Sequence, residues 1–245
     1  MLSLEEEKLV DEFCRINEIE ADRELVFRAL CHSSFTNELA QNGERLLESN
    51  ERMEFLGDAV LELSLARTLF GNYSLSEGDM SKVRAMVGSE KVLSYVARSM
   101  RIGEYIFLGK GERLSGGSER DSILADAFEA VLAAIFLTGG LDISVEFVQS
   151  KLSEYIEKAV GGDLILDYKT SLQELTQARF SSRPVYETIL DEGPPQDKWF
   201  KVGVFLEGRI VGEGEGRTKK AAEQLAAKHA LETLNESVNG AGAEQ

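Results

Sequence analysis

Apolar residues recur three and four positions apart through most of the first 160 residues. This is the spacing of one face of an α-helix. It predicts helices over 4–16, 22–30, 49–70, 76–93, 121–138 and 143–159. Asp22 and Ser76 stand where N-cap residues are expected, just before two of these stretches. No segment here alternates apolar and polar residues as a strand does, so residues 1–160 are predicted to form an all-α domain.

The pattern changes after Gly161 and Gly162, a pair that favours a linker. A short helix is predicted over 168–178, followed by strands over 184–190, 200–206 and 209–213. Thr218 is the expected cap of a last helix, whose apolar stripe is Ala222, Ala226, Ala230 and Leu234. We therefore predict a multidomain chain, made of an all-α domain (1–160), a linker (161–166), a small α+β domain of order α-β-β-β-α (167–236) and a disordered tail (237–245).

Acidic side chains gather on one face of the predicted helix over 49–70. Glu51, Glu54 and Asp58 are spaced i, i+3 and i+7, which places them within about 60° of one another around the helix axis. Like charges at this spacing repel by roughly 0.2–0.5 kcal/mol per pair. A solvated helix face is the ordinary explanation of such a cluster, and the spacing alone leaves that explanation open.

A second acidic pair, Asp126 and Glu129, interrupts the apolar run ILADAFEAVLAAIF at 123–136. Carboxylates flanked by apolar residues are incompletely solvated, and such a pair needs a cation. A site built only from carboxylates suits a hard cation, Mg²⁺ or Mn²⁺. A di-iron bundle would need Glu-x-x-His, which neither His32 nor His229 supplies. The two acidic groups therefore predict a magnesium site of the kind that performs phosphoryl transfer.

The net charge of −16 argues, by itself, against a partner rich in phosphate. Residues 1–160 carry a net charge of −12 and residues 167–236 a net charge of −2, so any nucleic-acid site must be a local patch. Arg217, Lys219 and Lys220 form such a patch at a helix start, where phosphate is already attracted, although a solvated basic turn remains an alternative.

Targeting signals and metal-binding cysteines are not evident. Cys14 and Cys31 fit no metal spacing and are expected to be reduced. The acidic N-terminus is unlike a secretory signal. The apolar stretch 123–137 is expected to be too short and too charged to cross a membrane. A cytoplasmic protein is the expectation.

Several segments resemble one protein family. NERMEFLGDAVLEL (50–63) closely resembles the signature of bacterial ribonuclease III, and SILADAFEAVLAAIF (122–136) resembles the second acidic motif of that family. RALCHSS (28–34) and EGDMSKVRA (77–85) match segments of the same domain. GPPQDKWF (193–200) and GRTKKAAEQLAAKHAL (216–231) resemble its double-stranded-RNA-binding domain. The resemblance covers roughly residues 5–236.

The resemblance implies a homodimeric endonuclease that cuts double-stranded RNA, including ribosomal RNA precursors, to 5′-phosphate and 3′-hydroxyl ends with a short 3′ overhang. It implies that four carboxylates bind Mg²⁺: Glu54, Asp58, Asp126 and Glu129. Of these, Asp58 and Glu129 are catalytic residues, and Glu129 is the most critical ligand. The resemblance sets Glu51 and Glu77 apart as supporting acids. Phe55 matches an aromatic residue that enters a socket of the partner subunit, and an ordinary core phenylalanine is the alternative.

In the second domain, the resemblance implies that Gln173 and Glu174 reach the minor groove and that Arg217, Lys219 and Lys220 contact phosphates. Gln196 stands where the family often has histidine, and an altered contact is expected there. His32 and His229 are expected to be structural, with an RNA contact as the alternative for His32.

Two competing functions remain at this point. A non-catalytic protein that binds duplex RNA would retain both domains without cutting, and a carboxylate-bridged redox metalloprotein would need iron. Incubation with duplex RNA and Mg²⁺ separates the first of these from a nuclease, and an iron-free preparation that still cuts excludes the second.

Overall fold

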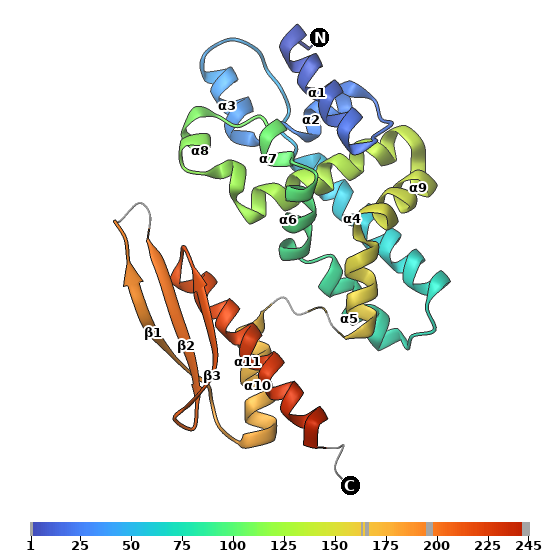
Figure 1. Cartoon of the computed structure of the whole chain (residues 1–245). Helices are drawn as coiled ribbons and strands as arrows, with labels where there is room; N and C mark the ends of the chain where they lie inside the picture. The colour runs from blue at the N-terminus through green and yellow to red at the C-terminus, as the bar shows by residue number, and fades with distance from the viewer. Residues whose placement is uncertain (1, 163, 165–166, 195–197, 242–245) are drawn as a thin grey trace. The chain divides into compact units, whose positions relative to one another are not determined.

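The computed structural model describes residues 2–162, 164, 167–194 and 198–241. It divides into two compact units, Met1–Leu164 and Ile165–Gln245. The first is helical, and the second carries three strands between two helices (Figure 1). Both parts of the predicted fold class are confirmed.

The first unit contains ten helical segments among its described residues, and most of the predicted helices are present. They are α1 (Leu4–Asn17), α2 (Arg23–Ala29), α3 (Ser33–Gln41), α4 (Glu51–Asn72), α5 (Glu77–Val87), α6 (Glu90–Ser99), α7 (Ile102–Tyr105), α8 (Lys110–Leu114), the 3-10 helix η1 (Gly117–Glu119) and α9 (Asp121–Gly161). Asp22 caps α2 as expected, because its carboxylate accepts a hydrogen bond from the backbone N–H of Leu25 at 3.0 Å.

The prediction of a single helix over 76–93 is wrong. The structure ends α5 at Val87 and starts α6 at Glu90, with Ser89 as the N-cap between them. The apolar spacing continues across the break, whereas the backbone does not. Three short helices, α3, α7 and α8, were also missed, and His32 is the N-cap of α3.

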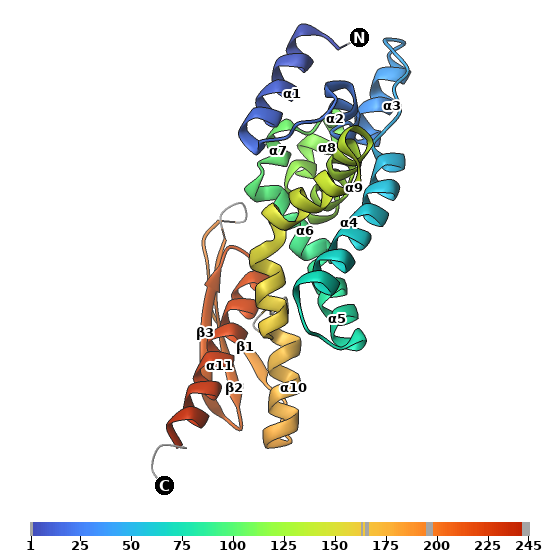
Figure 2. The same ribbon diagram turned by 90° about the vertical axis from the view of Figure 1, so that its right-hand side faces the viewer.

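The longest helix, α9, forms the centre of the first unit. Gly140 has φ 78° and ψ −170°, which divides α9 into two helical segments at the predicted glycine pair. Phe128, Val131 and Leu132 are fully buried, and α9 packs on α4 and α6 (Figure 2). Among the described residues, α9 alone has the length and composition of a membrane span, and half of its most apolar stretch is buried. Packing against α4 and α6 accounts for this apolar composition.

The second unit is α10 (Tyr168–Phe180), β1 (Val185–Glu192), β2 (Trp199–Leu206), β3 (Arg209–Gly216) and α11 (Lys219–Ala241). The three strands form an antiparallel sheet of order β1-β2-β3, in which Val204 pairs with Tyr186 and with Gly212. Val202 and Val204 are fully buried beneath the alanine stripe of α11. The apolar face of β2 and the alanine stripe of α11, each predicted from the sequence, therefore pack together in one core.

Close contact between β3 and α11 depends on small residues. A Cβ on Gly212 would lie 2.5 Å from the backbone oxygen of Ala226, and one on Gly214 would lie 2.5 Å from that of Ala222. Helix α11 extends to Ala241 and so overlaps the segment 237–245 that is predicted to be a disordered tail.

Candidate metal centre and nucleic-acid interface

The N-terminus of α4 is held by the chain that precedes it. Asn50 is 2% exposed, and its side-chain Nδ2 donates to the backbone oxygen of Ala29 at 3.3 Å. Its backbone N–H donates to the oxygen of Cys31 at 2.8 Å, and its own oxygen accepts the N–H of Glu54 at 2.8 Å. These bonds fix the first turn of α4, which carries the acidic motif.

Helix α4 crosses α9 at the position of the second acidic motif. A Cβ on Gly57 would lie 1.8 Å from the backbone oxygen of Glu129, which is far inside van der Waals contact. Only glycine allows the two helices to approach this closely. The crossing therefore brings the side chains beside Gly57 toward those beside Glu129.

Three of the predicted carboxylates come together at this crossing. One ligand oxygen from each of Glu54, Asp126 and Glu129 lies within 4.8 Å of the others, and all three side chains are partly buried. Asp58 is exposed and lies outside this group, although its charge raises the pKa values of both Glu54 and Glu129. Asp58 therefore belongs to the edge of the carboxylate cluster, a name kept below for Glu54, Asp126 and Glu129.

Burial and mutual repulsion both disfavour the ionised form of the cluster. Burial raises the pKa of Glu129 to about 8, helped by the charges of Asp58, Asp126 and Glu54. Burial also raises the pKa of Glu54, with repulsion from Asp126 among the further causes. The pKa of Asp126 is raised by burial and by Glu90, against a smaller opposing effect of His32.

These properties fit a cation site. Three half-buried carboxylates that repel one another lack a countercharge, and a divalent cation supplies one. Oxygen-only ligands suit hard cations such as Mg²⁺. A solvated helix face does not explain Asp126 and Glu129, because both side chains are partly buried.

The two supporting acids are exposed and lie outside the carboxylate cluster. Glu51 starts α4, and its charge raises the pKa of Glu54. Glu77 starts α5 and accepts a hydrogen bond from the hydroxyl of Ser81 at 3.1 Å. Glu77 also lines a cavity of about 480 Å³ between α4 and α5, so its surroundings differ from those of the cluster.

Phe55 is 81% exposed on α4. An ordinary core phenylalanine is therefore excluded. Leu63 and Phe70 are also exposed on the same helix, at 52% and 81%, and both line the cavity between α4 and α5. This helix thus presents apolar side chains to its surroundings as well as acids.

In the second unit, the predicted RNA-binding residues that the structure describes are exposed. Gln173 and Glu174 lie on α10, and Lys219 and Lys220 form the first turn of α11. The hydroxyl of Thr218 accepts the backbone N–H of Ala221 at 3.1 Å and so caps α11 as predicted. Arg217 precedes this cap and is exposed, whereas Gln196 lies outside the described residues.

Gln173 and Lys220 line one cavity of about 590 Å³, formed by α10, β1 and α11. The structure therefore brings together two residues that the sequence places 47 positions apart. Acids accompany the bases, because Lys169 pairs with Glu223 at 2.7 Å inside the same cavity. Asp167 and Glu223 line the cavity beside Lys169 and Lys220, so its lining carries no net positive charge.

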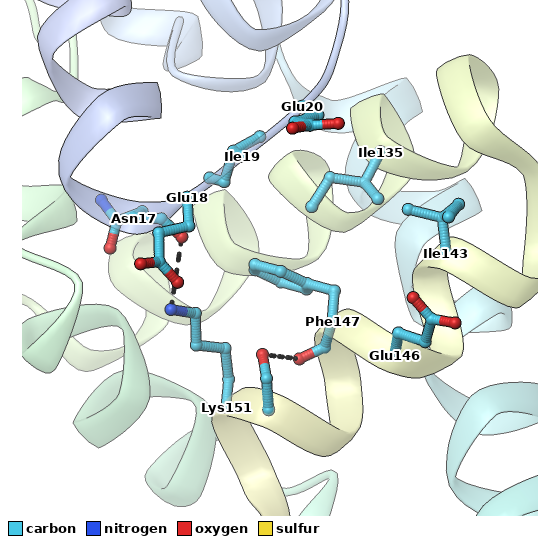
Figure 3. A pocket seen from close by; sticks show the side chains of 10 residues that line it. Asn17, Glu18, Ile19, Glu20, Ile135, Ile143, Glu146, Phe147 and Lys151 are labelled. Carbon is cyan, nitrogen blue, oxygen red and sulfur yellow. Dashed lines mark hydrogen bonds between the residues drawn. The ribbon is translucent and has the colours of Figure 1, made fainter.

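Another cavity, of about 280 Å³, is lined by residues of α1, the α1–α2 connection and α9 (Figure 3). Lys151 points across it and donates to the backbone oxygen of Asn17 at 3.4 Å. Ile135 and Phe147 form its apolar wall. None of the predicted site residues lines it.

Sequence reasoning missed Gly57 and Asn50. The motif NERMEFLGD at 50–58 contains both residues, so their position in it was the available signal. Their roles depend on the crossing of α4 with α9 and on the bond to Cys31, which connect residues far apart along the chain.

Comparison with known proteins follows the same division into two units. A family model described as ribonuclease-III-like matches residues 22–156, and the double-stranded RNA binding motif matches residues 168–234.

Similar proteins include Ribonuclease 3 of Pseudothermotoga lettingae, which is 47% identical over 86% of this chain and 89% of its own length. Ribonuclease 3 of Pelotomaculum thermopropionicum is 48% identical over 86% of each chain. Among solved structures, the nuclease domain of ribonuclease III from Campylobacter jejuni matches with a TM-score of 0.53 and 34% identity, over 60% of this chain and 97% of that one.

Proposed function

Because this chain belongs to the ribonuclease III family, we propose that its carboxylate cluster is the magnesium site of an endonuclease that hydrolyses double-stranded RNA. The activity on double-stranded RNA follows from the family and from the RNA-binding motif of the second unit. The single observation that carries the proposed site is the convergence of Glu54, Asp126 and Glu129 within 4.8 Å.

The carboxylates have distinct tasks in this proposal. Glu54, Asp126 and Glu129 supply ligand oxygens, and exposed Asp58 lies at the edge, where the substrate arrives. When bound, Mg²⁺ neutralises charge on the scissile phosphate and lowers the pKa of water. Glu129 must lose its proton before it can act as a ligand, and its pKa of about 8 makes this proton the hardest to remove. Mn²⁺ has similar ligand preferences and is expected to substitute.

A homodimer completes the proposal. The similar nuclease domain from Campylobacter jejuni is described as having a region involved in dimer formation, and exposed Phe55 is a suitable interface residue here. Two symmetric sites would cut opposite strands and leave 5′-phosphate and 3′-hydroxyl ends with a short 3′ overhang. Structured transcripts in the cytoplasm, ribosomal RNA precursors among them, are the proposed substrates. Glu51 and Glu77 are proposed to support the site near the interface and the RNA.

Replacing Phe55 by serine should weaken the dimer at least tenfold, because the variant loses a large apolar anchor at the interface. Thermal stability of the isolated subunit should change little, since Phe55 is 81% exposed. Analytical ultracentrifugation over a concentration series measures the dissociation constant. Leu114→Ser removes an 88% exposed apolar residue of α8 and serves as the control. Equal dissociation constants for the two variants would contradict the role of Phe55.

The second unit is proposed to hold the duplex by shape and charge. Double-stranded RNA is recognised through phosphates and 2′-hydroxyls across the minor groove. Gln173 and Glu174 on α10 are proposed to reach that groove, and Gln196 to add a contact from the β1–β2 connection. Arg217, Lys219 and Lys220 are proposed to meet phosphates at the start of α11, where the helix dipole adds to their charge.

Replacing both Lys219 and Lys220 by alanine should weaken duplex binding by roughly ten- to a hundredfold at moderate salt, and it should do so for every duplex sequence. The slope of log affinity against log salt should fall by about one for each phosphate that the variant no longer neutralises. Electrophoretic binding titrations at several salt concentrations measure both. Lys228→Ala, on the same helix but paired with Glu232, should change neither quantity. An unchanged salt slope in the double variant would contradict the assignment.

The proposed function is tested by incubating purified protein with duplex RNA, with and without Mg²⁺, beside a single-stranded control of the same sequence. Cleavage of the duplex alone, dependent on Mg²⁺, is expected. An intact duplex under saturating binding would instead support the non-catalytic alternative, and a requirement for iron would support the redox alternative.

A further inference from the structure

His32 lies close enough to the carboxylate cluster to lower the pKa of Asp126, and it has no part in the function proposed above. It is the residue before α3 and caps that helix. Its neighbour Cys31 accepts the N–H of Asn50, which in turn accepts the N–H of Glu54 at the start of α4. The backbone of His32 donates to the oxygen of Phe107 at 3.1 Å. Three segments therefore fix its position next to the acidic end of α4.

One nitrogen of the His32 ring is already committed. The backbone N–H of Ser34 donates to Nδ1 at 3.2 Å, and the Ser34 hydroxyl lies 2.9 Å from the same atom. That hydroxyl oxygen accepts the N–H of Gly109 at 3.0 Å, so its own proton is available to donate to Nδ1. With two donors directed at Nδ1, the neutral ring carries its proton on Nε2.

The Nε2–H group has no hydrogen-bond partner in the part of the chain that the structure describes, and the ring is only partly buried. Its surroundings are acidic. Glu90 raises the pKa of Asp126 and His32 lowers it, and His32 is the one basic side chain among the described groups that shift the pKa values of the cluster. The cluster oxygens accept hydrogen bonds and, when ionised, donate none.

We propose that His32 is an RNA-contacting residue of the cleavage site, whose Nε2–H donates to a phosphate oxygen of the strand held at the carboxylate cluster. This inference rests on the proposed function. A phosphate at this site meets carboxylates that cannot donate to it, so a fixed N–H donor has a specific use there. A donor held in place before the reaction stabilises developing charge without reorganisation. The hydrogen bonds to Nδ1 are what hold this donor.

His32→Asn separates the two tasks of the residue. Asparagine is a good N-cap, so it can replace Nδ1 as acceptor for the N–H of Ser34, but its side chain is too short to place a donor where Nε2 lies. We expect single-turnover cleavage of duplex RNA to fall about a hundredfold. The melting temperature and the affinity for the duplex, measured in EDTA, should remain near the wild-type values. Cleavage within threefold of wild type would show that His32 is only a helix cap.

His32→Gln keeps the hydrogen-bond donor and weakens the helix cap, the opposite of His32→Asn. Glutamine can carry an N–H donor to the position of Nε2 but is a poor cap, so this variant should be less stable than His32→Asn and should cut at least tenfold faster. If His32 were only a cap, activity would follow stability and the order of the two variants would reverse. This comparison remains informative even if one variant folds less well.

A modified substrate identifies the group contacted. On a duplex with 2′-deoxy nucleotides on both sides of the scissile bond, His32→Asn should slow cleavage as much as on unmodified RNA. Loss of the effect on that substrate would point to a ribose hydroxyl and overturn the phosphate assignment. Cleavage by the wild-type chain in the same assay tests the proposed function separately, so the failure of one is distinguishable from the failure of the other.

Discussion

Replacing Glu129 by glutamine is expected to reduce the cleavage of duplex RNA at least a hundredfold in Mg²⁺ while leaving duplex binding unchanged. The substitution keeps the size of the side chain and removes one anionic ligand from a site that has three within 4.8 Å. Binding should persist because Lys219 and Lys220 lie in the other unit. Single-turnover cleavage and electrophoretic binding, measured on the same preparation, give the two quantities.

Glu157→Gln is the matched control, because it removes one negative charge from an exposed position of the same helix, α9. It should cut at the wild-type rate. If Glu129→Gln also cuts at that rate, the assignment of the cluster is wrong.

Glu129→Gln has a second readout, its thermal stability as a function of pH, which requires neither metal nor RNA. Burial raises the pKa of Glu129 to about 8 in the folded protein, against 4.5 ordinarily. Between these values the folded state retains a proton that the unfolded state has lost, so the free energy of unfolding decreases as pH rises from 4.5 to 8. Glutamine has no proton to lose. Metal-free Glu129→Gln should therefore melt at the wild-type temperature near pH 4.5 and several degrees higher at pH 8.

Replacing Gly57 by alanine is expected to destabilise the first unit by about 3 kcal/mol or more and to abolish cleavage. The new Cβ would lie 1.8 Å from the backbone oxygen of Glu129, so α4 and α9 must move apart. A backbone atom cannot yield as a flexible side chain does, and overpacking at such a contact is costly. The displacement would also separate Glu54 from Asp126 and Glu129. Thermal unfolding and Mg²⁺-dependent cleavage measure the two effects.

Gly71→Ala tests whether the effect belongs to the crossing. Gly71 lies on the same helix, and a Cβ there would meet nothing within 4 Å. Alanine is the better helix former by about 0.5–1 kcal/mol, so this variant should be as stable as the wild type or slightly more so. Similar losses in both variants would mean that the close approach at Gly57 is unimportant.

Local sequence pattern predicted the long, regular elements of the fold and missed the short ones. Helical spacing located α4 and both segments of α9, and alternation located β2, because each of these elements buries one continuous face. The join between α5 and α6 was missed because apolar spacing continues through Gly88 and Ser89 while the helix stops there. Short α7 and α8 bury too few residues to leave a periodic signal.

The candidate site was likewise predictable only in part from the local sequence. The apolar flanks of Asp126 and Glu129 indicated incomplete solvation, and the structure leaves both partly buried. Spacing alone grouped Glu51, Glu54 and Asp58 equally, whereas the structure brings only Glu54 of these into the cluster. That selection depends on where α9 crosses α4, which follows from tertiary packing at Gly57. The tautomer of His32 likewise depends on Ser34 and Gly109, and the bond to Gly109 joins segments far apart in sequence.

The claim that Glu54, Asp126 and Glu129 bind a divalent cation is tested by calorimetric titration of Mn²⁺ into the wild-type chain and into Glu129→Gln at pH 7, in two buffers of different ionisation enthalpy. The wild type should bind Mn²⁺ and release protons, because Glu129, with its pKa of about 8, must ionise on binding. The variant should bind at least tenfold more weakly and release fewer protons. Equal affinity and equal proton release in the two proteins would contradict the claim.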